Sequence, residues 1–172
     1  YYLIGGAYSL LKNEKFKLKS IGQIGIVVED IQKAVESYWN SFGIGPWSIY
    51  TAAPPDLTDT FIRGKPVSFS MKLAFARVGS MMLELIQPLE GESIYKEFIR
   101  EKGGGMHHVA TYDVEDMESA LSQLEKQGIR VLQRGRWRGA SFAYLDTEKT
   151  LGIIVELVKR TGGFPTPEST YP

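Results

Sequence analysis

The chain has 172 residues, with 20 Lys and Arg against 20 Asp and Glu, and 12% of its residues are aromatic. This length and aromatic content fit one compact domain and exclude a disordered chain, while the neutral charge balance argues against a nucleic-acid partner, which needs a basic face. The absence of cysteine excludes disulfides, thiolate metal sites and cysteine nucleophiles, and without an evident membrane span or signal peptide we expect a cytoplasmic protein with no membrane partner.

The first half of the chain predicts one strand, one helix and three more strands. Residues 1–19 are expected to form a loosely attached N-terminal extension. Apolar and β-branched residues predict a buried strand from Ile21 to Glu29, and Asp30 is placed to cap a helix that ends at Gly43. The three further strands are expected over residues 47–52, 67–78 and 81–87. The polar, proline-containing residues 53–65 predict a long loop.

The second half repeats this order after a short helix over residues 93–100 and a glycine break at Gly103–Gly105. A strand over residues 108–114 is followed by a helix that begins after Asp116 and ends at Gly128. Three strands are then expected, over residues 129–137, 141–145 and 152–158. Residues 161–172 are punctuated by glycine and proline, which predicts an irregular C-terminal tail.

Short sequence matches between the halves indicate an internal duplication. Val28-Glu29-Asp30-Ile31 recurs as Val114-Glu115-Asp116-Met117, and Leu83-Glu84-Leu85 recurs as Val155-Glu156-Leu157 in the matching strand. Several matches in the same order are typical of a repeated unit. The pattern predicts an α+β fold in which residues 20–160 form a single domain made of two βαβββ modules, 20–90 and 106–160.

Two glutamates stand in otherwise apolar strands, at matched positions of the two modules. Glu84 lies between Leu83 and Leu85, and Glu156 lies between Val155 and Leu157. A carboxylate taken out of water must be paired, protonated or bound to a cation, although a glutamate on the solvated face of an edge strand is the simpler alternative. Because the modules are equivalent, we expect their matching faces to meet around one cavity.

The only two histidines, His107 and His108, are adjacent and open the first strand of the second module. Alternation sends one imidazole into the concave face of the sheet and the other away from it. The position that corresponds to His108 in the first module is Gln23. Gln23, Glu84, His108 and Glu156 would together suit a divalent ion such as Zn, Co, Ni, Mn or Fe, with positions left open for a substrate.

These residues resemble the vicinal oxygen chelate superfamily, which includes glyoxalase I, methylmalonyl-CoA epimerase, extradiol dioxygenases and bleomycin-resistance proteins. The resemblance covers residues 21–159, and residues 103–108, Gly-Gly-Gly-Met-His-His, are most similar to the epimerase branch. It implies a glyoxalase-like fold, with two βαβββ modules whose eight strands form an open barrel around a divalent metal held by the same four residues. In that family the first ligand is usually histidine rather than the glutamine found at Gln23.

The resemblance implies a metal-dependent epimerase, isomerase or lyase that acts on a small oxygen-chelating substrate through an enolate-like intermediate. Glu156 or Glu84 would serve as the catalytic base, and Lys72 is a possible substitute. The epimerases carry a glutamate base near positions 68–70, where this chain has Ser68, Phe69 and Ser70. That difference keeps open a non-catalytic protein that sequesters an aromatic small molecule in the cavity.

We expect mainly aromatic side chains to line the cavity, although core filling is the alternative for most of them. The predicted lining consists of Phe69, Lys72, Phe75, Trp137, Phe142 and Tyr144. Edge strands of such half-barrels also favour a homodimer, and a structural or interaction domain is a further alternative.

Overall fold

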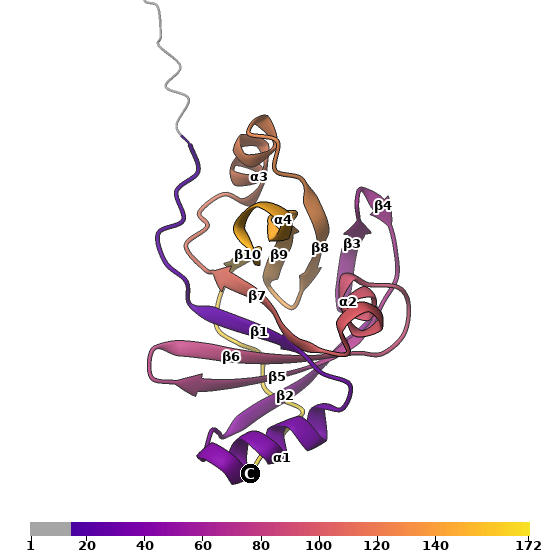
Figure 1. The fold of residues 1–172 in the computed structure, drawn as a ribbon, viewed down its shortest axis with the longest axis vertical. Helices are drawn as coiled ribbons and strands as arrows, with labels where there is room; N and C mark the ends of the chain where they lie inside the picture. Colours follow the sequence, from indigo (N-terminus) through magenta and orange to yellow (C-terminus); the bar gives the residue numbers. More distant parts are fainter. Residues whose placement is uncertain (1–14) are drawn as a thin grey trace, which may run out of the picture.

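A computed structural model describes residues 15–172 of the chain, which contain eleven strands and four helices (Figure 1). The strands are β1 Gln23–Val27, β2 Trp47–Ala52, β3 Leu57–Ile62, β4 Lys65–Pro66, β5 Met71–Val78, β6 Met81–Pro88, β7 Gly105–Thr111, β8 Val131–Trp137, β9 Ala140–Leu145, β10 Ile154–Arg160 and β11 Ser169–Tyr171. The helices are α1 Ile31–Phe42, α2 Ile94–Lys102, α3 Met117–Lys126 and α4 Glu148–Leu151.

All the described strands belong to one mixed sheet, in the order β11-β2-β5-β6-β1-β7-β10-β9-β8-β3-β4. This order has two ends, so the sheet is not closed, and the predicted eight-stranded barrel is not confirmed. The predicted βαβββ order is present in each half, as β1-α1-β2-β5-β6 and as β7-α3-β8-β9-β10. Within the sheet, β2-β5-β6-β1 is matched by β8-β9-β10-β7, and β1 meets β7 at the centre (Figure 1).

The strand register shows which positions of the two halves are equivalent. In the first half β1 is parallel to β6 and Gly25 pairs with Glu84, and in the second half β7 is parallel to β10 and Ala110 pairs with Glu156. Where the halves meet, β1 and β7 are antiparallel, and Gly25 pairs with His108. Gln23 and His108 therefore occupy equivalent places, each two residues before the partner of a glutamate.

Each half is covered on its outer face by one helix. Ile31 and Val35 of α1 pack in one apolar cluster with Leu85 of β6, and Leu124 of α3 packs in another with Leu157 of β10. The predicted N-caps are confirmed, because the carboxylates of Asp30 and Asp116 accept hydrogen bonds from the amides of Lys33 (3.1 Å) and Ser119 (3.0 Å). The inner faces of the two halves form the third and largest apolar cluster.

The prediction of a long loop over residues 53–65 is wrong. Residues 57–62 form β3, which pairs with β8 of the other half and continues the sheet beyond it. Leu57 and Ile62 are buried, so this hairpin adds to the shared core. The pairing also covers an edge of β8 that would otherwise expose unpaired backbone groups.

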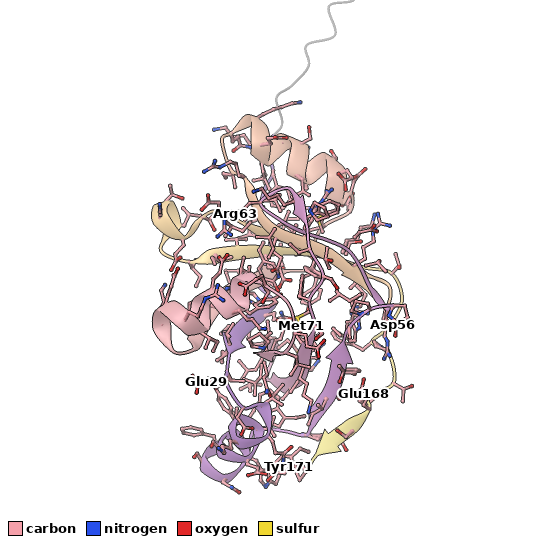
Figure 2. All side chains as sticks on the ribbon, turned by 90° about the vertical axis from the view of Figure 1, so that its right-hand side faces the viewer. Glu29, Asp56, Arg63, Met71, Glu168 and Tyr171 are labelled. Atoms are coloured by element: carbon pink, nitrogen blue, oxygen red, sulfur yellow. The ribbon has the colours of Figure 1, made fainter. Side chains whose placement is uncertain are left out.

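The C-terminal tail is not irregular throughout, as the sequence predicted. Ser169–Tyr171 form β11, which pairs with the edge of β2. Just before it, the Glu168 carboxylate accepts hydrogen bonds from the backbone amide and the hydroxyl of Thr51, both at 2.9 Å. Figure 2 shows Glu168 and Tyr171 along this yellow strand. The tail thus leaves β10 in the second half and ends against the first half.

Several boundaries also differ from the predictions. Residues 67–70 precede β5 without strand structure, and β7 begins at Gly105, earlier than expected. The short helix α4 was not predicted. Of the predicted N-terminal extension, residues 1–14 lie outside the described part, and residues 15–19 contain no helix or strand. No helix within residues 15–172 is long and apolar enough to cross a membrane.

Candidate metal centre

Glu84 and Glu156 face the space between the two halves because the leucine that follows each of them faces a covering helix. Leu85 and Leu157 are fully buried beneath α1 and α3 on the outer faces of the two halves. Since side chains alternate along a strand, Glu84 and Glu156 must face the interior. They are only 6% and 4% exposed, and His108, which reaches the same space from β7, is completely buried.

These three side chains converge on one point. His108 Nε2 lies 3.3 Å from Glu84 Oε2 and 3.1 Å from Glu156 Oε2. One ligand atom from each residue can be chosen so that all three lie within 4.8 Å of one another. Within residues 15–172, neither His108 Nε2 nor Glu156 Oε2 makes a hydrogen bond of acceptable geometry. Unsatisfied buried donor atoms of this kind are what a cation would satisfy.

Gln23 lies beside the cluster, and in this structure it serves as a partner of Glu84. Its amide nitrogen donates a hydrogen bond to Glu84 Oε2 at 2.7 Å, and its amide oxygen accepts one from the Tyr112 hydroxyl. The amide oxygen is the atom that would bind a metal, and here it faces Tyr112. The ligand role of Gln23 therefore stays a prediction, whereas its contact with Glu84 is observed.

The charges in the cluster depend on one another. Burial lowers the pKa of His108, but the carboxylates of Glu156 and Glu84 outweigh burial and raise this pKa to about 9. Burial, together with the charge of Glu156, raises the pKa of Glu84 above its ordinary value. Without a metal, the imidazole is therefore held in its charged form by two buried carboxyl groups.

His107 lies on the same side of β7 as His108, so the prediction that one imidazole points away is wrong. Both rings pack against Tyr144, and the pairing register with β1 shifts between His108 and Met106, which interrupts the alternation of side chains. Burial, together with the charge of His108, lowers the pKa of His107 to about 3, so this ring is neutral. The Nδ1 atoms of the two rings are 3.0 Å apart, and the neutral ring can accept only if His108 Nδ1–H donates. This hydrogen bond leaves Nε2 of His108 directed at the two carboxylates, which is the arrangement that a metal-binding histidine needs.

The raised pKa of His108 predicts how the metal-free protein responds to pH. A histidine whose pKa is raised by folding stabilises the fold below its ordinary value of 6.5, and this contribution is lost as pH rises to about 9. We expect the free energy of unfolding, measured with urea and a chelator, to fall by about 3 kcal/mol between pH 6 and 9.5. His108→Gln should remove this decrease, and an equal decrease in both proteins would contradict the assignment.

A small cavity of about 50 Å³ adjoins the cluster. Glu84 and Glu156 line it, together with four of the residues expected from the sequence: Phe75, Trp137, Phe142 and Tyr144. The other two do not line it. Phe69 is buried in the core against Tyr95, and Lys72 is exposed. Lys72 alternates with the interior residues Met71 and Leu73, so it points to the outer face of β5, and its proposed role as a base is wrong.

Comparison with known proteins identifies the family. A model of the glyoxalase/bleomycin resistance protein/dioxygenase superfamily matches residues 22–144. The chain belongs to this superfamily. Among its relatives, the uncharacterized protein YqjC of Bacillus subtilis is 28% identical over 149 residues, which cover 84% of this chain and 95% of YqjC.

Several homologues and structural neighbours of this superfamily member are methylmalonyl-CoA epimerases. The ethylmalonyl-CoA/methylmalonyl-CoA epimerase of Cereibacter sphaeroides is 28% identical over 142 residues, covering 80% of this chain and 95% of the epimerase. A solved structure of Streptomyces coelicolor methylmalonyl-CoA epimerase in complex with 2-nitronate-propionyl-CoA has a TM-score of 0.62 at 22% identity. The match covers 87% of this chain and 99% of that chain, and it supports the glyoxalase-like fold.

Several residues that line the cavity beside the cluster were not predicted from the sequence. Tyr112, Arg160 and Phe164 contribute to its lining, and none of them was predicted. For two of them the signal was present in the sequence, because Tyr112 alternates in phase with His108, and Arg160 alternates in phase with Glu156. Phe164 comes from the tail, whose path back to the first half could not be read from local sequence.

Proposed function

We propose that this protein is a metal-dependent isomerase of the epimerase type, acting on a small substrate with two neighbouring oxygens. The observation that carries the proposal is the buried cluster of Glu84, His108 and Glu156, whose ligand atoms lie within 4.8 Å of one another. A protein that only needed a stable core would gain nothing from two carboxyl groups in this position, because burying them costs free energy.

The donor set fits a divalent cation. Two carboxylates and one imidazole are ligands that Mn, Co, Ni, Zn and Fe all accept, and two negative charges would offset the charge of the ion. His108 would bind through Nε2 while its Nδ1–H donates to His107. When bound, such an ion supplies Lewis-acid stabilisation of negative charge that develops on a substrate oxygen.

Among the two glutamates, Glu156 is the better placed to move a proton. Glu84 Oε2 already accepts a hydrogen bond from Gln23, which fixes its carboxylate. Glu156 Oε2 lies 3.1 Å from His108 Nε2 but makes no hydrogen bond of acceptable geometry within residues 15–172, and Glu156 lines the cavity. We infer that Glu156 takes a proton from one face of a substrate carbon as general base, and that inversion requires a second acid to give a proton to the opposite face, for which Glu84 is the candidate in the cluster.

The activities for which the relatives are named indicate the first substrate class to test. Several are epimerases of methylmalonyl-CoA or ethylmalonyl-CoA. In such 2-substituted malonyl thioesters the C2 proton lies between two carbonyl groups and is acidic, and two oxygens are available for chelation. We propose an acid of this kind, bound as a thioester, as the substrate.

The test follows the exchange of that proton. The purified protein, supplied with Mn²⁺ or Co²⁺, is incubated with methylmalonyl-CoA in deuterated water, and the C2 proton signal is followed by NMR. We expect deuterium to enter C2 faster than in the protein-free control, and exchange to stop when a chelator removes the metal. Exchange no faster than in the control would contradict the proposed function for this substrate.

The aromatic lining supports a second candidate, a non-catalytic protein that binds an aromatic small molecule. Phe75, Trp137, Phe142 and Tyr144 give the cavity a largely apolar wall. A binder of this kind has no requirement for the metal, so it predicts a protein that purifies without one and takes up none when Mn²⁺ or Co²⁺ is supplied. Metal analysis therefore separates the two candidates.

A further inference from the structure

Arg160 extends from β10 into the same cavity as Glu156. The two residues are four positions apart on the same face of the strand, so their Cα atoms are separated by about 13 Å. Val158 lies between them on that face and also lines the cavity. Arg160 is the only lysine or arginine among the described residues that line this cavity.

The guanidinium of Arg160 has hydrogen-bonding capacity to spare. Its Nη1 donates to the carbonyl oxygens of Arg138 (3.2 Å) and Gly163 (3.4 Å), but its Nε is buried and has no partner within residues 15–172. No carboxylate in that part of the chain forms a salt bridge with it. By contrast, Arg136 and Arg138 on β8 and its turn pair with Asp59 and Asp56.

The C-terminal tail holds this guanidinium in place. Its Cζ lies 4.4 Å from the centre of the Phe164 ring, and Phe164 in turn packs edge-on against Phe75 at 5.2 Å. The following residue, Pro165, accepts a hydrogen bond from the Tyr50 hydroxyl at 3.1 Å. Farther along the tail, the Glu168 carboxylate accepts a hydrogen bond from the backbone amide of Thr51 on β2 (Figure 2). The guanidinium is therefore positioned before any ligand arrives.

The contacts leave one edge of the guanidinium available. Nη1 is occupied by backbone carbonyls, whereas Nε and Nη2 make no hydrogen bond within the described residues. These two groups form a fork that matches the two oxygens of a carboxylate or a phosphate. An anionic ligand in this cavity also meets the repulsion of Glu84 and Glu156, which a cation at the other end would offset.

We propose that Arg160 binds an oxyanion of the ligand, at the end of the cavity away from the Glu84–His108–Glu156 cluster. By binding this oxyanion, Arg160 would determine which ligands the cavity accepts. Its role in selecting a substrate rests on the proposed function. The oxyanion is either the carboxylate of the reacting acid, through the oxygen that does not bind the cation, or a phosphate of its thioester carrier. The substrate class is then an oxygen-chelating acid derivative that carries at least one negative charge.

The first arm of the test measures binding without metal or turnover. Propionate and inorganic phosphate are titrated into the protein labelled with ¹⁵N, and the Nε–Hε signal of Arg160 is followed by NMR. We expect this signal to shift, and Arg160→Gln to weaken binding of at least one anion by about tenfold or more. Arg136→Gln, an exposed arginine on the same sheet, is the matched control and should bind like the wild type.

A second variant keeps the test decisive if Arg160→Gln fails to fold. Arg160→Lys retains the charge but loses the fork, so it should bind the anion more weakly than the wild type. Equal binding by the wild type and by every folded Arg160 variant would overturn the proposal. So would a saturable titration in which the Nε–Hε signal of Arg160 does not move.

The second arm uses exchange kinetics to separate the two sources of the oxyanion. If Arg160 binds the acid, Arg160→Gln should raise KM about tenfold or more for both methylmalonyl-CoA and methylmalonyl-pantetheine, which lacks the nucleotide phosphates. If it binds the carrier, KM should rise for the CoA ester alone. Anion binding that depends on Arg160 without any exchange would refute only the proposed function, and exchange with unchanged KM for both esters would refute only the role of Arg160.

Discussion

Glu156→Gln is expected to slow deuterium exchange at C2 of methylmalonyl-CoA by about 10²–10⁴-fold, the range that a lost general base typically costs. Glutamine keeps the size of the side chain but cannot accept the proton. It also removes one of the two negative charges that face His108 Nε2 at 3.1–3.3 Å. The rate should be measured with saturating Mn²⁺, so that weakened metal binding does not by itself account for the loss.

The matched control for this variant is Glu125→Gln. Glu125 is exposed on α3, and its replacement changes the net charge of the protein by the same amount. The control should exchange at the wild-type rate. If Glu156→Gln also exchanges at that rate while remaining folded, Glu156 is not the base, and Glu84 would have to be tested in its place.

Gly25→Ala is expected to remove His108 from the cluster. A Cβ atom at Gly25 would lie 1.8 Å from Cε1 and 2.2 Å from Nε2 of His108, so the imidazole could not stay where it is. The displaced ring would lose its contacts with both glutamates. We expect metal affinity, measured by calorimetry, to fall by at least 10–100-fold, and stability to fall by about 1–3 kcal/mol.

Gly22→Ala provides the control on the same segment. A Cβ atom there would come no closer than 3.4 Å to any other group, at the ring of Tyr112, which is ordinary van der Waals contact. This variant should bind metal like the wild type. A Gly25→Ala protein with unchanged metal affinity would show that the imidazole of His108 is not needed for binding.

The internal duplication is why much of the site could be predicted from the sequence. Once Glu84 and Glu156 are recognised as equivalent, alternation fixes the face on which each lies, and the repeat brings those faces together. The structure brings both next to His108. Their role as metal ligands, the boundaries of the modules, a homodimer and a cytoplasmic location stay predictions.

What could not be predicted depends on contacts between residues distant in the sequence. Nothing in the sequence of residues 57–62 indicates that they pair with β8, which is distant in the chain. The two prolines just before this segment, Pro54 and Pro55, favour a loop. The same holds for β11, a short and mostly polar strand that exists because the edge of β2 is free to pair. The need for glycine at position 25 arises only from the ring of His108 on the neighbouring strand.

The central claim is that Glu84, His108 and Glu156 together bind one divalent cation. Elemental analysis of the purified protein, after incubation with Mn, Co, Ni, Zn or Fe and removal of unbound ions, tests this most directly. We predict about one equivalent of metal per chain in the wild type and a clear loss in His108→Ala. A wild-type protein that retains none of these ions would contradict the claim.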